Sequence, residues 1–277
     1  MKKCSIIPFL LTAVAAGPIV TPAWQNHMDL FTTPSACNSS QELMSCSFGN
    51  SSNVDTCCVE NPGGVVLFTQ LWNSDVVNSP THQWTMHGSW PDNCDGTYGS
   101  FCNFENTEVD SVEEVLKSKG EYELISYMNN FWLNDNGTND AFWSHEFNKH
   151  ATCMSTIRPS CYDNYTEGQN VVDFVKMSIR QYHELPTFTW LADAGIVPSY
   201  SQTYKAEDIQ AALDKAFGYK VFVGCTNGTI LDEVWYYHQA QGSLLRQNFV
   251  KIDTTYASTC KGDVQYLPKQ GKSFVLW

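Results

Sequence analysis

The sequence lacks several features that define familiar classes of protein. It has no apolar run of about 20 residues, the length that a transmembrane helix requires, which excludes a membrane-spanning helix. Basic residues are scarce, with 16 Lys and Arg against 29 Asp and Glu and a formal net charge of −13, whereas nucleic-acid-binding proteins usually carry basic patches. No CxxC pair, repeat, low-complexity segment or Pro/Ser-rich linker occurs. These absences favour a single domain without a cysteine-bound metal.

The start of the chain has the pattern of a secretory signal peptide. Lys2 and Lys3 form a basic start, residues 6–16 an apolar core, and the small residues at 13–16 a cleavage site. The sequence therefore predicts a signal peptide at 1–20, no membrane anchor, and delivery outside the cell or to a vacuolar or lysosomal lumen.

Residues 21–277 are expected to form one domain rich in cysteine. Ten cysteines remain after Cys4, which lies in the signal, and an even number in a secreted chain predicts disulfides. Their spacing alone does not choose among the many possible pairings. Sequons agree with a secretory route and predict N-glycosylation at Asn38, Asn50, Asn136, Asn164 and Asn227.

Apolar patterning places strands early and late in the chain, with helices between them. A buried strand is expected at 65–72, and a short strand at 83–87 pairs with it. Ser111 begins a capping box that opens a helical stretch at 111–132, interrupted near Gly120. This order is typical of an α+β fold. The other expected elements are helices at 171–184 and 206–217 and strands at 220–225, 230–238 and 249–254.

A cluster of ionisable residues lies at 144–153, which reads SHEFNKHATC. If the segment is helical, successive residues turn by about 100°. Glu146 and His150 are then neighbours on one face, and so are His145 and Lys149. Two imidazoles, a carboxylate and an amine within one arc can move protons and stabilise an anion together.

A solvated surface helix and a zinc site are the alternatives for this segment. Phe142, Trp143 and Phe147 surround the polar groups, which disfavours a surface helix. A zincin motif has its histidines four residues apart. His145 and His150 are five apart, with a lysine between them whose charge opposes a metal ion. The sequence therefore predicts no metal and no cofactor.

A second segment completes the first. Residues 84–96 read WTMHGSWPDNCDG and place His87 at the end of a short apolar strand, before a loop of Pro, Asn, Asp and Gly. Together the two segments resemble the active-site motifs of the ribonuclease T2 family, HGLWP and HEWxKHGTC. Here they read HGSWP and HEFNKHATC, so Ser89, Phe147 and Ala151 depart from the family pattern. None of these departures removes a titrating group.

The resemblance covers about Cys37 to Pro268 and is closest to the fungal branch of the family with five disulfides. It implies a central antiparallel sheet flanked by helices. The cysteine order of that branch implies the pairs Cys37–Cys58, Cys46–Cys94, Cys57–Cys161, Cys102–Cys153 and Cys225–Cys260.

The family's chemistry uses the 2′-hydroxyl of RNA as the nucleophile. By resemblance, His150 is the base that takes the hydroxyl proton, and His87 is the acid that protonates the leaving 5′-oxygen. Lys149 and Glu146 would stabilise the transition state, and His145 would bind the phosphate. The resemblance thus implies an endoribonuclease that acts on single-stranded RNA through 2′,3′-cyclic phosphates. DNA lacks the nucleophile and would not be cut, and a monomer is expected.

Base binding requires aromatic platforms and a few polar groups. By resemblance, the first base site consists of Trp90, Asp92 and Tyr98. Each aromatic residue assigned to this site or to the second one could equally belong to the core. The second base site maps onto Gln70, Leu133, Asn134, Asp135, Asn136 and Phe142.

The negative charge of the chain opposes RNA binding, and an acidic working pH reconciles the two. In acid the clustered histidines become cationic, while Asp and Glu, with ordinary pKa values of about 3.9 and 4.3, lose charge. Two other hypotheses are a catalytically inactive relative that acts as a binding or toxicity protein, and a secreted glycosidase or protease. The complete set of histidines and lysine disfavours the first, and Glu146 has no partner carboxylate at a suggestive spacing for the second.

Overall fold

The computed structural model describes residues 37, 43–47, 54–76, 79–105 and 107–270. The signal peptide expected at 1–20 and the sequons at Asn38 and Asn50 lie outside these ranges. The strands are β1 (Val65–Leu71), β2 (Thr85–Asp92), β3 (Thr203–Lys205), β4 (Phe222–Thr226), β5 (Ile230–Ala240), β6 (Phe249–Ile252) and β7 (Asp263–Gln265). The α-helices are α2 (Val112–Ser118), α3 (Tyr122–Phe131), α4 (Asn139–Lys149), α5 (Gln169–Glu184), α6 (Thr187–Asp193) and α7 (Ala206–Phe217).

The strands form one sheet in the order β2-β1-β5-β7-β3, with β4 and β6 also paired to β5. The pairs are antiparallel except for a short parallel contact between β5 and β7, where Ile230 lies opposite Gln265. The predicted α+β fold with a central sheet is therefore confirmed, and the sheet is mixed rather than wholly antiparallel. Strand β2 lies at one edge of it.

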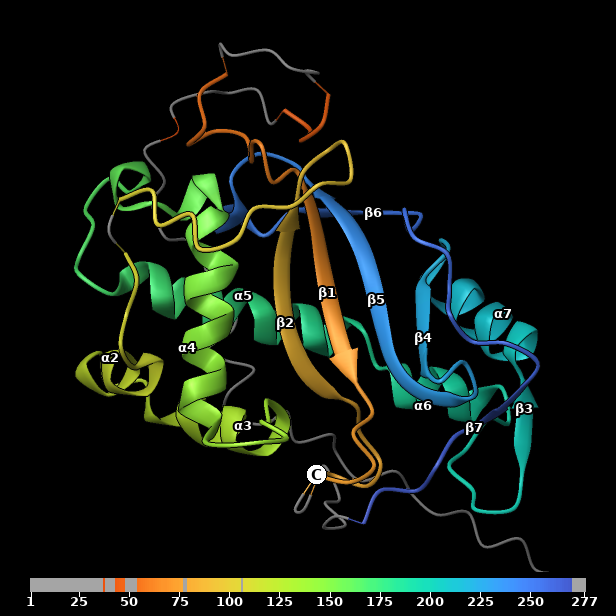
Figure 1. Cartoon of the computed structure of the whole chain (residues 1–277). Coiled ribbons are helices and arrows are strands. Elements are labelled where there is room, and N and C mark those ends of the chain that lie inside the picture. Colours follow the sequence, from red (N-terminus) through yellow and green to blue (C-terminus); the bar gives the residue numbers. More distant parts are fainter. Residues whose placement is uncertain (1–36, 38–42, 48–53, 77–78, 106, 271–277) are drawn as a thin grey trace, which may run out of the picture.

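Helices pack against one face of the sheet and beside its β2 edge. Helix α5 crosses behind the strands, while α2, α3 and α4 gather next to β2 (Figure 1). Phe68 and Tyr236 from the strands and Phe174 from α5 belong to one buried apolar cluster between the layers. Val65 and Leu67 belong to a smaller apolar cluster on the opposite face, so β1 is buried on both sides.

Several predicted helix boundaries are confirmed. The side chain of Ser111 accepts a hydrogen bond from the backbone N–H of Glu114 at 3.0 Å and begins α2. Gly120 separates α2 from α3 with a φ of 75°, and Gly218 ends α7 with a φ of 92°. Glycine adopts these left-handed conformations without the steric cost that a side chain would bring.

Strand β2 is longer than the sequence predicted. It runs to Asp92, so His87 lies inside the strand and not at its end. The expected break at Pro91 does not occur, because β2 is an edge strand and the missing N–H of a proline can face away from the ladder there. The ladder is instead irregular between Thr69 and Gln70, opposite His87.

All five disulfides implied by the resemblance are present. They join Cys37 to Cys58, Cys46 to Cys94, Cys57 to Cys161, Cys102 to Cys153, and Cys225 to Cys260. The adjacent Cys57 and Cys58 bond to different partners, as predicted.

Candidate active site

Helix α4 carries the ionisable cluster along the β2 edge of the sheet (Figure 1). The helix begins after Thr138, whose side chain accepts a hydrogen bond from the backbone N–H of Ala141. Trp143 and Phe147 are each 1% exposed and anchor α4 in the core. The predicted helix over this segment is confirmed, and it ends at His150.

The Glu146 carboxylate lies at the centre of the cluster and is 1% exposed. Its Oε1 atom is 3.4 Å from Nε2 of His87, and its Oε2 atom is 4.0 Å from Nε2 of His150. The indole Nε1 of Trp90 donates a hydrogen bond to Oε2 at 2.8 Å. One carboxylate thus joins residues of β2 with residues of α4.

The Trp90 ring is part of the same cluster. It stacks on the His150 imidazole, with 4.8 Å between ring centroids and 17° between planes. It also meets the His87 ring edge to face at 4.8 Å. The ring therefore holds both histidines in position in addition to any role in base binding.

The two histidines flank a charged carboxylate. Burial alone would raise the pKa of Glu146, but the hydrogen bond and charge of His87, together with the hydrogen bond from Trp90, outweigh it and lower that pKa. Burial lowers the pKa of His150 to about 3, against the attraction of Glu146. His150 is therefore neutral in mild acid, and its 4.0 Å approach to Glu146 is not an ion pair at that pH.

Lys149 and His145 lie on the more open side of the helix. The positive charges of both contribute to lowering the pKa of His150. Lys149 is half-buried and His145 is exposed, so His145 can be reached from solvent. The structure thus brings His87, Glu146, Lys149 and His150 together, with His145 at the rim.

Gly88 allows β2 to approach the carboxylate. A Cβ atom at this position would lie 2.5 Å from Oε2 of Glu146 and 3.5 Å from Nε1 of Trp90. Real Cβ atoms do not come that close to an oxygen, so only glycine permits the observed contact between strand and helix.

The departures from the family pattern have local partners. The buried Ser89 hydroxyl lies 3.0 Å from the Ser178 hydroxyl and donates to Oε1 of Gln181 at 2.7 Å, both on α5. Phe147 packs edge to face on Phe174 at 5.7 Å. Ala151 is buried in the turn after the helix. None of the three displaces an ionisable group from the cluster.

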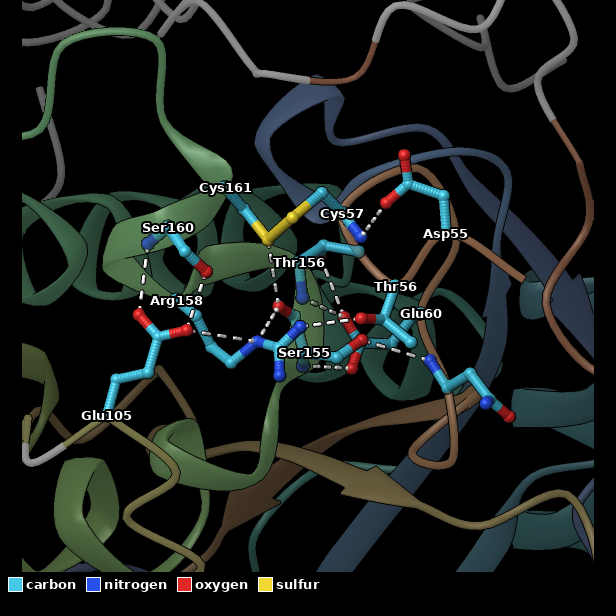
Figure 2. Close-up of polar contacts among 11 residues, drawn as sticks. Asp55, Thr56, Cys57, Glu60, Glu105, Ser155, Thr156, Arg158, Ser160 and Cys161 are labelled. Carbon is cyan, nitrogen blue, oxygen red and sulfur yellow. Dashed lines mark hydrogen bonds and ion pairs between the residues drawn. A yellow bond between two sulfur atoms is a disulfide. The ribbon is translucent and has the colours of Figure 1, made fainter. Parts of the chain in front are cut away.

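The short segment Ser155–Ile157, which follows the turn after His150, is held by the buried carboxylate of Glu60. This carboxylate accepts hydrogen bonds from the backbone N–H groups of Ser155 and Thr156 and from the Thr156 hydroxyl (Figure 2). The neighbouring Cys57–Cys161 disulfide joins the same two segments (Figure 2). Burial raises the pKa of Glu60, although these hydrogen bonds oppose it.

The first predicted base site lies next to Trp90. A β-bridge places Tyr98 opposite Asp92, and the Tyr98 side chain is 66% exposed. Asp92 is 8% exposed, and burial raises its pKa to about 6. The structure therefore brings the three predicted residues to one corner of the site, where Tyr98 is the most exposed of them.

The residues of the second predicted base site do not all reach the surface. Gln70 is fully buried, and its amide bonds the Leu185 carbonyl at 2.8 Å and the Thr187 hydroxyl at 2.7 Å. The structure thus gives Gln70 no exposed atom. Phe142 is half-buried, with its ring 5.3 Å from that of His87. Leu133 is 9% exposed, Asn134 is half-buried, and Asp135 and Asn136 are exposed.

Two aromatic residues near the cluster were not predicted. The Trp235 ring packs edge to face on Trp90 at 5.6 Å, and its Nε1 donates to Glu233 at 2.8 Å. Phe101 contacts His145. Trp235 is far from Trp90 in sequence and meets it only through the pairing of β1 with β5 and β2, so no local pattern signals the contact.

Other predictions concern the surface. The sequon residues Asn136, Asn164 and Asn227 are exposed, and their glycosylation stays a prediction. Within the described ranges, no helix is long and apolar enough to cross a bilayer. In the same part of the chain, no group of three or more His, Cys, Asp and Glu residues could hold a metal ion.

Comparison with known proteins relates both the fold and the site to one family. A model described as the ribonuclease T2 family matches residues 63–260. A Debaryomyces hansenii protein named ribonuclease T2-like is 46% identical over 226 residues, which are 80% of this chain and 56% of that protein. Ribonuclease T2 of Aspergillus oryzae is 40% identical over 221 residues, or 79% of each chain.

One solved structure is similar to this chain in both sequence and fold. The crystal structure of Actibind, described as a T2 ribonuclease, has 39% sequence identity and a TM-score of 0.79. The match covers 86% of this chain and all of that one. The chain spans little more than half the length of the Debaryomyces relative, at 56%.

Proposed function

The chain belongs to the ribonuclease T2 family, and on that premise we propose that it is an endoribonuclease that cleaves single-stranded RNA in acid without a metal ion. The observation that carries the proposal is the placement of His87 and His150 on either side of the Glu146 carboxylate. Two histidines on separate elements can serve as acid and base at opposite sides of one phosphate.

The proposed reaction is a transphosphorylation. His150 takes the proton of the 2′-hydroxyl, whose oxygen attacks the neighbouring phosphorus. His87 gives a proton to the 5′-oxygen as its bond to phosphorus breaks. The products are a 2′,3′-cyclic phosphate and a new 5′-hydroxyl end. DNA has no 2′-hydroxyl and is not cleaved by this route.

The protonation states support these roles. A base must begin neutral, and the pKa of about 3 leaves the His150 imidazole neutral in mild acid. An acid must have a proton to give, and Nε2 of His87 lies 3.4 Å from Oε1 of Glu146, a carboxylate oxygen that can accept a hydrogen bond from its N–H. The lowered pKa of Glu146 keeps the carboxylate charged in the same pH range.

Two basic side chains would balance the negative charge of the phosphate. In the proposal, Lys149 stabilises the additional negative charge of the transition state, and the exposed His145 binds the phosphate. Glu146 acts by orienting the two histidines that it contacts.

The bases bind on either side of this centre. We assign the nucleotide that supplies the 2′-hydroxyl to Tyr98, Asp92 and the free part of the Trp90 ring. The nucleotide that leaves lies against Phe142, beside His87. Gln70 is left out because it is fully buried. Among the remaining residues of the predicted second site, Asp135 and Asn136 are the exposed ones.

The setting of the reaction is also a proposal. The signal-like start, five disulfides and sequons support delivery outside the cell or to a vacuolar or lysosomal lumen. In an acidic lumen the net charge of −13 is reduced, which favours contact with RNA. We propose that the protein acts there as a monomer.

Single histidine substitutions test the assignment. His87→Ala and His150→Ala should each lower kcat on RNA by about 10²–10⁴-fold, the usual contribution of a general acid or base. His82→Ala is the matched control, because His82 is exposed and lies outside the cluster. Full activity in either cluster variant would contradict the mechanism. An inactive wild-type protein that still binds RNA would favour a non-catalytic relative.

A further inference from the structure

The loop between β2 and α2 holds an exposed aromatic ring that the proposed reaction does not use. Phe101 is 51% exposed, although large apolar side chains are usually buried. Its backbone has a φ of 51°, and that of Asn103 has a φ of 44°. The left-handed region is costly for a residue with a bulky side chain, and it persists only where surrounding contacts impose it.

Three contacts impose that conformation. The backbone N–H of Phe101 donates to the carbonyl of Lys149 at 2.9 Å. The next residue, Cys102, is bonded to Cys153 just beyond α4. The Asn103 side chain accepts a hydrogen bond from the backbone N–H of Thr107 at 2.7 Å. The loop is therefore fastened to the end of α4, and its exposed ring is held in a fixed place.

The ring lies next to the proposed phosphate-binding residue. Its centroid is 5.8 Å from that of the His145 imidazole, at an angle of 74°. His145 is itself exposed. A rigid aromatic surface thus stands beside the residue that would hold the phosphate of the cleaved bond, and the base of a neighbouring nucleotide can stack on such a surface.

We propose that Phe101 forms a third nucleotide position beside His145, which takes the residue on the 5′ side of the cleaved pair. This inference rests on the proposed ribonuclease function. The occupant is the RNA strand itself, because the ring lies beside His145 and the backbone N–H of Phe101 donates to the carbonyl of Lys149, so the position is continuous with the proposed active site.

The direction of the strand follows from the roles of the two histidines. His150 serves the nucleotide on the 5′ side of the cleaved bond, and His87, with Phe142 against it, serves the nucleotide on the 3′ side. Phe101 is tied to the His150 end of α4, whereas Phe142 lies in the first turn of the helix. The part of the RNA strand on the 5′ side of the cleaved pair therefore passes over Phe101.

Oligonucleotides with one ribonucleotide test the third position, because their cleavage site is fixed. The substrates are the dinucleotide rA-dA and the trinucleotide dA-rA-dA, and the quantity is the ratio of their kcat/KM values. Stacking of one base corresponds to about 5- to 150-fold, so the wild-type ratio should lie in that range. The ratio cancels any loss that both substrates share.

The variants separate the platform from loop support. Phe101→Ala should bring the ratio close to one, and Phe101→Trp should keep it. Phe104→Ala is the matched control, because Phe104 is 52% exposed in the same loop, and it should leave the ratio unchanged. A wild-type ratio near one, or a ratio that Phe101→Ala does not lower, would overturn the third position while leaving the ribonuclease function intact.

A binding measurement covers the case in which no substrate is cleaved. The all-deoxy dinucleotide dA-dA and trinucleotide dA-dA-dA are titrated calorimetrically into the wild-type protein and Phe101→Ala. Tighter binding of the trinucleotide by about 5- to 150-fold, lost in the variant, supports the position. Equal affinity of the wild-type protein for both would overturn it.

Discussion

Gly88→Ala tests whether the close contact between β2 and α4 is what aligns the cluster. The added methyl group would lie 2.5 Å from Oε2 of Glu146. The backbone of Gly88 is outside the left-handed region, so alanine is tolerated there, and any effect comes from the contact itself. The carboxylate must move, and its bond from Trp90 Nε1 must lengthen.

The size of the effect follows from this distance. An ordinary contact between a carbon and a neighbouring atom is about 3.4 Å, so the carboxylate has to move by roughly 0.9 Å. A misplacement of about 1 Å can cost 10²-fold in rate. We therefore expect kcat on a dinucleotide to fall by about 10²-fold, with a folded protein.

Ser89→Ala is the matched control one residue further along β2. Ser89 points to the opposite face and bonds Gln181, so this variant should lose stability and keep its activity when folded. Loss of a buried hydrogen bond costs about 1–3 kcal/mol, or about 2–12 °C in Tm for a domain of this size. The assays are dinucleotide cleavage and thermal unfolding. If Gly88→Ala retained full activity, the alignment of the cluster by this contact would be refuted.

Four further predictions concern base binding, the pH dependence of activity, the pH dependence of stability, and a disulfide. Tyr98→Ala should weaken dinucleotide cleavage by about 5- to 150-fold through loss of base stacking, and unchanged kinetics would remove Tyr98 from the base site. Cleavage should persist in acid and fall only near pH 3, where His150 takes up a proton; an acid limb near pH 6 in kcat/KM would contradict this. Burial lowers the pKa of His238 to about 4, so the unfolded chain binds a proton there first and stability falls as pH drops from about 6.5 to 4; in His238→Phe, urea titrations across that range should show a smaller fall. Replacing Cys57 and Cys161 together by Ser should cost about 2–5 kcal/mol of unfolding free energy, and an unchanged urea midpoint would argue against this.

The sequence predicted the ionisable cluster on α4 because its residues are close together in the chain. Glu146 and His150 are four residues apart, and a helix brings them to one face whatever surrounds it. The strands at 65–72 and 230–238 were also predicted from the sequence, since both are rich in β-branched and aromatic residues. The disulfides followed from the family resemblance and not from their spacing.

The features that the sequence did not predict depend on tertiary contacts. β3 and β7 are three residues each and exist because they pair with each other. Pro91 suggested a break, but an edge strand tolerates proline. Gln70 was assigned to base binding, whereas its place opposite α5 and α6 buries it completely. No sequence pattern marks Phe101, because its position depends on the hydrogen bond from its backbone N–H to the carbonyl of Lys149.

A substrate with a single 2′-deoxy substitution tests the central claim most directly. The RNA should be cleaved in acid in the presence of a chelator and yield a 2′,3′-cyclic phosphate as the first product. The same oligonucleotide with the 2′-hydroxyl removed at the cleavage site should remain intact. Cleavage of the deoxy substrate, or inhibition by the chelator that added metal reverses, would contradict the assignment of His87 and His150 as a metal-free acid and base.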